Sequence, residues 1–120
     1  MVTTRERDEI LISTIIKLIK RGAIPNLKKV IAKMHAADLA HLFPHLRPEE
    51  KSLVFDLLVK AKRMSETMSE MNSEDRNFFI QTTDPVTLAE VFHSMPADDV
   101  SDILANLPED EREPLLKLIK

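Results

Sequence analysis

Apolar residues recur along this chain at the spacing of amphipathic helices. Within each segment they fall three or four positions apart, which places them on one face of a helix. The segments open on Ser, Thr, Asp or Pro, and several carry acids in the first turn, as helix starts do. This pattern predicts about nine helices. They are expected over Thr3 or Thr4 to Arg21, Pro25–Met34, Ala36–Phe43 and Pro48–Lys62, then at Met64–Met71, from Ser73, from Asp84, at Asp98 and from Glu109 onward.

The same pattern predicts the fold class. No segment alternates polar and apolar residues with a period of two, so we expect an all-α fold. Two later segments match Asp38–Phe43, namely Thr87–Phe92 at an offset of 49 and Asp99–Leu104 at an offset of 61. Helices this short are marginal alone and must stack on their neighbours. We therefore expect a superhelix of short helices, an architecture that usually binds or scaffolds other molecules.

Length and composition indicate one domain over residues 1–120, with an N-terminal helix to residue 22 and the array over 23–120. Hydrophobic residues make up 43% and charged residues 31%, which is typical of a globular rather than a disordered chain. The lack of cysteine excludes disulfides, thiol nucleophiles and zinc–thiolate sites. Because the apolar run Ile10–Ile16 is too short to span a bilayer, we expect a cytoplasmic chain without direct membrane insertion.

Charge divides the chain into two unlike halves. Residues 1–63 hold 13 Lys and Arg against 7 Asp and Glu, whereas residues 64–120 hold 4 against 13. This asymmetry indicates a polarised molecule with one cation-attracting end, and it equally fits solvated helix faces that differ in sign. The basic half has only Phe43 and Phe55 as aromatic residues and no nucleic-acid-binding motif, so nucleic acid is not expected as a partner.

Acidic residues at helical spacing are the candidate metal ligands. Asp98 and Asp102 lie four positions apart and share one helix face, with Asp99 beside them. Such carboxylates repel each other, and Mg²⁺, which keeps several waters and takes one or two carboxylates, would relieve the repulsion. The alternative is a solvated helix start favoured by the helix dipole, and spacing alone favours this alternative. Glu66 and Glu70 form a second pair of the same kind.

The sequence contains no arrangement typical of a catalytic site. His41 and His45 have helical spacing, but Pro44 interrupts the helix between them. There is no Gly-x-Ser-x-Gly motif, and a single glycine leaves no glycine-rich phosphate loop. The methionines of Met64–Met71 are interpreted as core rather than as a binding groove. We predict that the chain is not an enzyme.

Three sequence motifs, taken together, indicate a known family. They are His35–Ala40, Met95–Leu104 and Leu107–Glu111. The first pairs a histidine with an Asp-apolar-Ala helix start, and the other two open helices with proline and acids. In this order and spacing they resemble the cytosolic N-terminal domain of MgtE-type magnesium transporters, over about residues 15–118. One departure is Ala36, which stands where the family usually has proline.

The resemblance implies a superhelix similar to armadillo-like arrays and to a flagellar motor switch protein. In the family this domain precedes a pair of CBS domains and a membrane pore, and Mg²⁺ bridges acids of the N domain and the CBS pair. High cytosolic Mg²⁺ locks the assembly and closes the pore. The matching ligands here are Asp98 and Asp102, with Glu66 as a third candidate and Asp99 as the adjacent acid. With half of each site missing, the isolated domain is expected to bind Mg²⁺ weakly.

Two hypotheses of function follow. In the first, the chain is a Mg²⁺-sensing regulatory domain that gates a magnesium transporter by docking its acidic face onto the CBS pair. Its partners would be the CBS pair and pore of the same transporter, at the cytosolic face of the inner membrane, with a homodimer as a further arrangement. In the second, it is a stand-alone helical adaptor that binds a basic protein and has no role in transport.

Overall fold

The structure is a computed structural model that describes residues 3–119; residues 1, 2 and 120 of the predicted domain lie outside this range. Within it, nine α-helices and one short 3₁₀ helix follow one another without a strand. They are α1 (Thr4–Arg21), α2 (Ile24–Ala32), α3 (Ala36–Leu42), η1 (Phe43–His45), α4 (Pro48–Lys60), α5 (Met64–Glu70), α6 (Ser73–Thr82), α7 (Pro85–His93), α8 (Ala97–Ala105) and α9 (Glu109–Ile119). The all-α prediction is confirmed.

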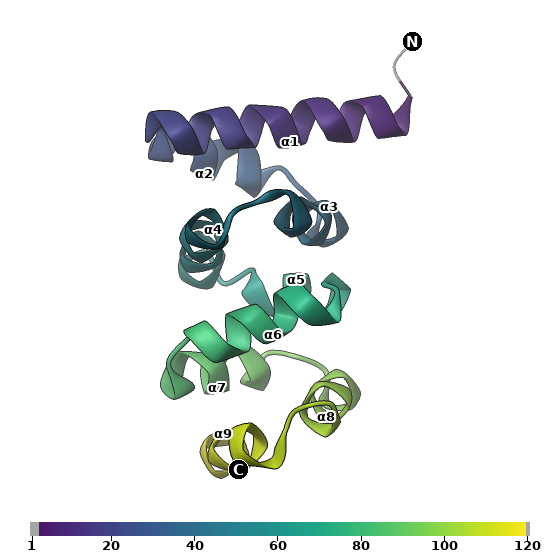
Figure 1. Cartoon of the computed structure of the whole chain (residues 1–120), viewed down its shortest axis with the longest axis vertical. Coiled ribbons are helices and arrows are strands. Elements are labelled where there is room, and N and C mark those ends of the chain that lie inside the picture. Colours follow the sequence, from purple (N-terminus) through teal and green to yellow (C-terminus); the bar gives the residue numbers. More distant parts are fainter. Residues whose placement is uncertain (1–2, 120) are drawn as a thin grey trace.

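The helices stack in sequence order into an elongated array, with α1 at one end and α9 at the other (Figure 1). The array measures 48 × 28 × 21 Å along its principal axes. Most contacts join helices that are close in sequence, above all α1 with α2, α3 with α5 and α7 with α9. Each helix therefore depends on its near neighbours for burial, as in repeat proteins.

Side-chain caps begin several of the helices. The Thr3 hydroxyl accepts a hydrogen bond from the amide of Glu6 at the start of α1, and the Asn72 side chain accepts one from the amide of Asp75 at the start of α6. At the start of α7 the Asp84 carboxylate accepts from the amide of Thr87 at 2.9 Å. That hydrogen bond, together with one from the Thr87 hydroxyl, lowers the pKa of Asp84 because both favour the charged form. The helix starts read from the sequence thus rest on capping chemistry.

Two helices end in the same backbone motif with different residues. After α1, Gly22 takes φ 68°, and the amide of Ala23 reaches back to the carbonyl of Leu18. After α4, Lys62 takes φ 59°, and the amide of Arg63 reaches the carbonyl of Leu58. This is the Schellman motif, in which the left-handed position favours glycine. The motif also explains why α4 ends at Lys60 rather than at the predicted Lys62.

Glycine at position 62 is therefore expected to stabilise the fold. The Lys62→Gly variant relieves a left-handed strain that exceeds the entropy cost of glycine, so the free energy of unfolding should rise by about 0.5 kcal/mol. Urea unfolding followed by circular dichroism measures this change. The matched control is Lys33→Gly at the end of α2, where φ is −92° and glycine should only destabilise. Changes of the same sign in both variants would contradict the interpretation.

Aromatic and sulfur-containing side chains fill the middle of the core. The ring of Phe55 lies 4.5 Å from that of Phe43 and 5.0 Å from that of Phe79, measured between centroids, which links η1, α4 and α6. Three methionines of the α5 region are buried, namely Met64, Met68 and Met71. Their interpretation as core residues is confirmed.

Some predicted burial is wrong. Helical spacing puts Ile10 with Leu11, Thr14, Ile15, Leu18 and Ile19 on the predicted apolar stripe of the first helix, but its side chain is 60% exposed. Because α1 closes the array, it packs on one side only, and of its apolar residues just Ile15 is fully buried. In α4, the apolar spacing predicts that Leu53, Val54, Leu57 and Leu58 are buried; the last three are, whereas Leu53 is half-buried and Phe55 takes a core position. Among the described residues, no helix has both the length and the apolar character needed to cross a membrane.

Candidate metal-binding surface

Helix α8 carries three of the four predicted ligands. Its inner side is fixed by Ile103 and Leu104, which are buried in the core. This orientation leaves Asp98 and Asp102 exposed, whereas Asp99 is half-buried. Asp98 and Asp99 also lie in the first turn, where the positive end of the helix dipole favours carboxylates.

Asp98 and Asp102 form an acidic pair without a cationic partner. Four positions apart on one helix, their Cβ atoms lie about 5–6 Å from each other. No Lys, Arg or His nitrogen of the described residues lies within 4.0 Å of either carboxylate. Exposed, uncompensated oxygens suit a hydrated Mg²⁺ that takes one or two protein carboxylates. The pair fits one side of a shared site.

Asp99 connects α8 to α5. Its Oδ2 accepts a hydrogen bond from the hydroxyl of Ser69 at 3.1 Å. Ser69 lies on α5 three positions after Glu66, so this contact brings the helix of the fourth predicted ligand beside α8. Asp99 therefore helps to position the acidic surface and has one oxygen already engaged.

Glu66 has a cation of its own. Its Oε1 lies 2.6 Å from Nε of Arg63, and the Glu66 side chain is 52% exposed. The guanidinium of Arg63 also donates to the carbonyls of Ile31 and Met34, 32 and 29 residues earlier in the chain respectively. A metal ion at Glu66 would have to compete with a guanidinium that is held in place from three directions. Glu66 consequently fits a Mg²⁺ site less well than Asp98 and Asp102 do.

The four acids do not close around a single point. Within residues 3–119, no group of three or more His, Asp or Glu side chains is arranged to hold a metal ion. The candidate site is therefore an open surface, whose further ligands would have to come from another surface.

Sequence reasoning missed how the helix starts divide their acids between solvent and interior. In four starts the second helical residue is an exposed acid; these residues are Glu49, Glu74, Asp98 and Asp110. The third helical residue is an acid that turns inward; these residues are Glu50, Asp75, Asp99 and Glu111. Aligning the four starts by helical position would have given this signal. It places Asp98 outward and Asp99 inward.

One of the inward acids, Asp75, belongs to a buried ion pair that the sequence did not suggest. Nζ of Lys51 on α4 lies 2.8 Å from Oδ1 of Asp75 on α6, and also over the ring of Phe78. Asp75 is 2% exposed, and its second oxygen has no hydrogen-bond partner among the described residues. This pair is structural, because it ties two neighbouring helices together and lies largely away from solvent.

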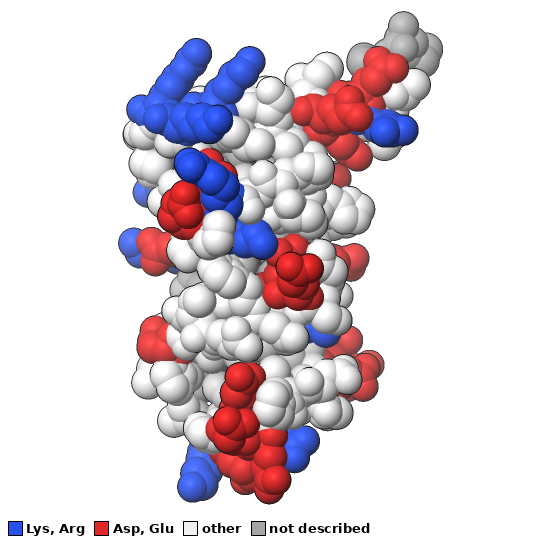
Figure 2. Space-filling view, viewed as in Figure 1, with Lys and Arg blue, Asp and Glu red and all other residues white. Residues whose placement is uncertain are grey.

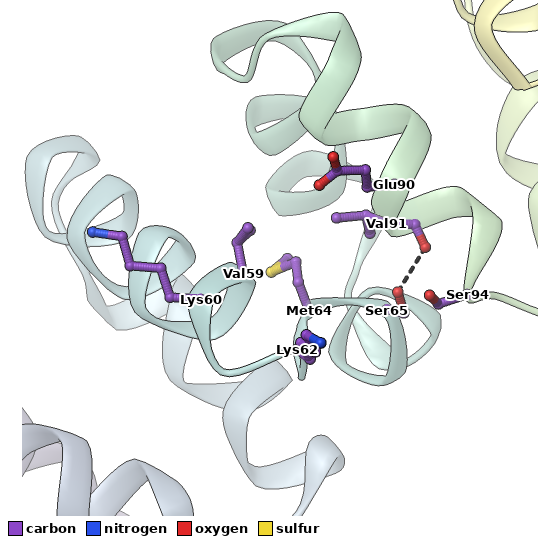
Figure 3. Close-up of a pocket in the computed structure, with 8 residues that line it drawn as sticks. All are labelled: Val59, Lys60, Lys62, Met64, Ser65, Glu90, Val91 and Ser94. Carbon is purple, nitrogen blue, oxygen red and sulfur yellow. Dashed lines mark hydrogen bonds between the residues drawn. The ribbon is translucent and has the colours of Figure 1, made fainter.

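A cavity of about 310 Å³ lies between α4, α5 and α7 (Figure 3). Val59 and Met64 lie on one side of it and Val91 on the other, while the hydroxyl of Ser65 donates to the carbonyl of Val91 at 2.6 Å. Its lining contains one carboxylate, that of Glu90, and no histidine. Lys60 and Lys62 also line it, but neither lysine nitrogen lies within 4.0 Å of the Glu90 carboxylate, so the cavity holds no preassembled pair of acid and base groups. The α8 surface is therefore the stronger candidate site.

A comparison with known families agrees with the resemblance seen in the sequence. The family model for the MgtE intracellular N domain matches residues 34–120, which is more than half of the chain and includes all four predicted ligands. Neither the curated proteins nor the solved structures gave a match. Helices α1 and α2 precede the matched region. The chain belongs to the family of MgtE intracellular N domains, which are regulatory domains of magnesium transporters.

Proposed function

We propose that this chain senses Mg²⁺ for a magnesium transporter by docking its α8 surface onto a CBS-domain pair of the same protein. The observation that carries the proposal is the exposed pair Asp98 and Asp102 in a chain that belongs to this family. Neither carboxylate has a cationic partner among the described residues. In the proposed site these two residues are the principal ligands. Asp99 supports the surface through Ser69, and Glu66 contributes only if Arg63 releases it.

The physical basis is a change of sign between two acidic surfaces. Without divalent ions, uncompensated carboxylates on the α8 surface repel acids on a facing domain. Mg²⁺ between the two surfaces turns this repulsion into attraction, and ion occupancy then sets the ratio of docked to undocked molecules. Because ligands come from both sides, Mg²⁺ binds the docked state better than the isolated domain, which is the differential affinity that a switch requires.

Docking would communicate ion occupancy to the pore. At high Mg²⁺ the docked cytosolic part is held in one arrangement and the pore is closed; at low Mg²⁺ the domain is free and the pore can open. The array suits this role, because Ile103 and Leu104 anchor α8 in the core and Asp99 bonds Ser69 of α5, so that α8 is expected to move with the domain.

Limited proteolysis of the chain joined to the CBS pair of its parent protein tests the proposal. Mg²⁺ should slow cleavage at the exposed connections of the array by about tenfold or more, because the docked state is protected and the free state is not. The chain alone should show little protection over the same Mg²⁺ range. Na⁺ at equal ionic strength separates ion bridging from screening. Protection that does not depend on Mg²⁺ would contradict the proposal and favour an adaptor role.

A further inference from the structure

A long basic segment begins the array, and all of its cations precede the family match. Residues 10–37 contain six Lys and Arg and no Asp or Glu. The six residues are Lys17, Lys20, Arg21, Lys28, Lys29 and Lys33, here called the basic end. All six are exposed, and none is within 4.0 Å of an acidic oxygen of the described residues. The basic end is a surface of unneutralised charge.

The basic end occupies one extremity of the molecule. Its residues lie in the last two turns of α1, in α2 and, in the case of Lys33, directly after α2. Lys and Arg atoms gather where α1 ends, whereas acidic atoms gather over α9 at the opposite extremity (Figure 2). The acidic α8 surface and the basic end are thus separate, and the two can act independently.

One apolar side chain of α1 is exposed two turns before these cations. Helical spacing places Ile10, Thr14, Lys17 and Arg21 in one row along α1, opposite the buried Ile15. Ile10 is 60% exposed. Ile10 thus adds a single exposed apolar side chain to a surface whose main feature is its positive charge.

We propose that the basic end binds a membrane surface through the phosphate and carboxylate groups of anionic lipids. Each Lys or Arg close to an anionic bilayer raises the partition onto it by roughly fivefold, and the contributions multiply while the cations face the same surface. The side chains are carried by two packed helices, so they are presented together without ordering a disordered segment. This inference goes beyond the proposed function and does not depend on the Mg²⁺ site.

Lipid fits the basic end better than nucleic acid does. The phenylalanines nearest in sequence are Phe43 and Phe55, and the chain has no Trp or Tyr, so α1 and α2 offer no ring on which bases could stack. Five of the six cations are lysines, whose ammonium groups act as point charges and bind phosphate in any orientation. A fluid surface of headgroups can adapt to such charges, whereas base recognition needs fixed donors.

Vesicle co-sedimentation of the whole chain tests the proposal. EDTA is added, so that no divalent ion can bridge the acidic α8 surface to lipid. The chain should bind vesicles with about 30% phosphatidylserine and leave vesicles of pure phosphatidylcholine unbound. Binding should disappear when salt is raised from about 50 mM to about 500 mM, because screening shortens the reach of the charges. Equal binding to both vesicle types would overturn the proposal.

Charge reversal locates the surface. Lys17→Glu with Arg21→Glu should lower binding by roughly twentyfold or more, because two of the cations are lost and two acids replace them. The matched control, Arg112→Glu with Lys117→Glu on α9, changes the net charge equally and should leave most binding intact. Ile10→Asn should weaken binding at constant charge. An equal loss in the α9 variant would overturn the proposal, as would complete displacement from vesicles by single-stranded RNA at equal phosphate.

Discussion

Replacement of Asp75 by alanine is expected to lower the free energy of unfolding by about 3–5 kcal/mol, a large part of the stability of a domain of this size. The change removes one partner of the Lys51–Asp75 pair and leaves the ammonium of Lys51, which is 15% exposed, beside the ring of Phe78 without its counter-ion. Because the pair joins α4 to α6, the loss falls on contacts between helices rather than on one helix. Urea unfolding followed by circular dichroism measures it.

A second variant tests whether the charges of Lys51 and Asp75 interact directly. Lys51→Met alone leaves the Asp75 carboxylate buried without a cation and should also destabilise. The double variant should cost less than the sum of the two single changes, because neither unpaired charge then remains buried. Such non-additivity is the signature of a direct interaction.

The matched control is an exposed pair of the same residue types on the same helix. Lys60 and Asp56 lie 3.0 Å apart on α4, with side chains 72% and 58% exposed. Asp56→Ala should change the free energy of unfolding by no more than about 0.5 kcal/mol, since water screens the pair. If Asp75→Ala costs no more than Asp56→Ala, the buried pair does not tie the helices together as argued.

Local chemistry explains why the helices could be predicted. Their starts depend on caps such as Asn72 and Asp84, which bond amides three positions ahead in the sequence. The end of α1 depends on Gly22, a residue whose backbone freedom is visible in the sequence. The end of α4 was placed two residues late, because a lysine at 62 gives no sign that it will take the left-handed conformation.

Contacts between distant segments explain what could not be predicted. The guanidinium of Arg63 bonds a carbonyl 32 residues earlier, and Lys51 pairs with an acid 24 residues later. Neither spacing leaves a periodic signal. Likewise, the sequence indicates that Ile10 belongs to an apolar stripe, but only the arrangement of the helices places α1 at the end of the array, with one side uncovered.

The candidate site, too, could be predicted only in part from the sequence. The helical spacing of Asp98 and Asp102 predicts their common face, and the structure places both on the exposed side of α8. Spacing could not indicate that Glu66 is paired with Arg63 or that Asp99 bonds Ser69, since both depend on how α5 lies in the array. The structure therefore ranks the four predicted ligands, while Mg²⁺ binding by them stays a prediction.

Removal of the α8 pair is expected to abolish Mg²⁺-dependent docking. In Asp98→Ala with Asp102→Ala, joined to the CBS pair, protease protection should be lost or should need at least about tenfold more Mg²⁺, because both principal ligands on this side are gone. Glu66→Ala should have a smaller effect, since Arg63 already neutralises that carboxylate. Both α8 residues are exposed, so unfolding should change little, by about the helix-dipole contribution of Asp98.

The control for this variant lies on the last helix. Glu109 and Glu113 of α9 are also exposed and four positions apart, so Glu109→Ala with Glu113→Ala removes the same charge at the same spacing. This control should keep the Mg²⁺ dependence of the unaltered chain. If it loses protection as the α8 variant does, Mg²⁺ acts by general screening of an acidic half of the molecule, and the assignment of Asp98 and Asp102 as ligands is wrong.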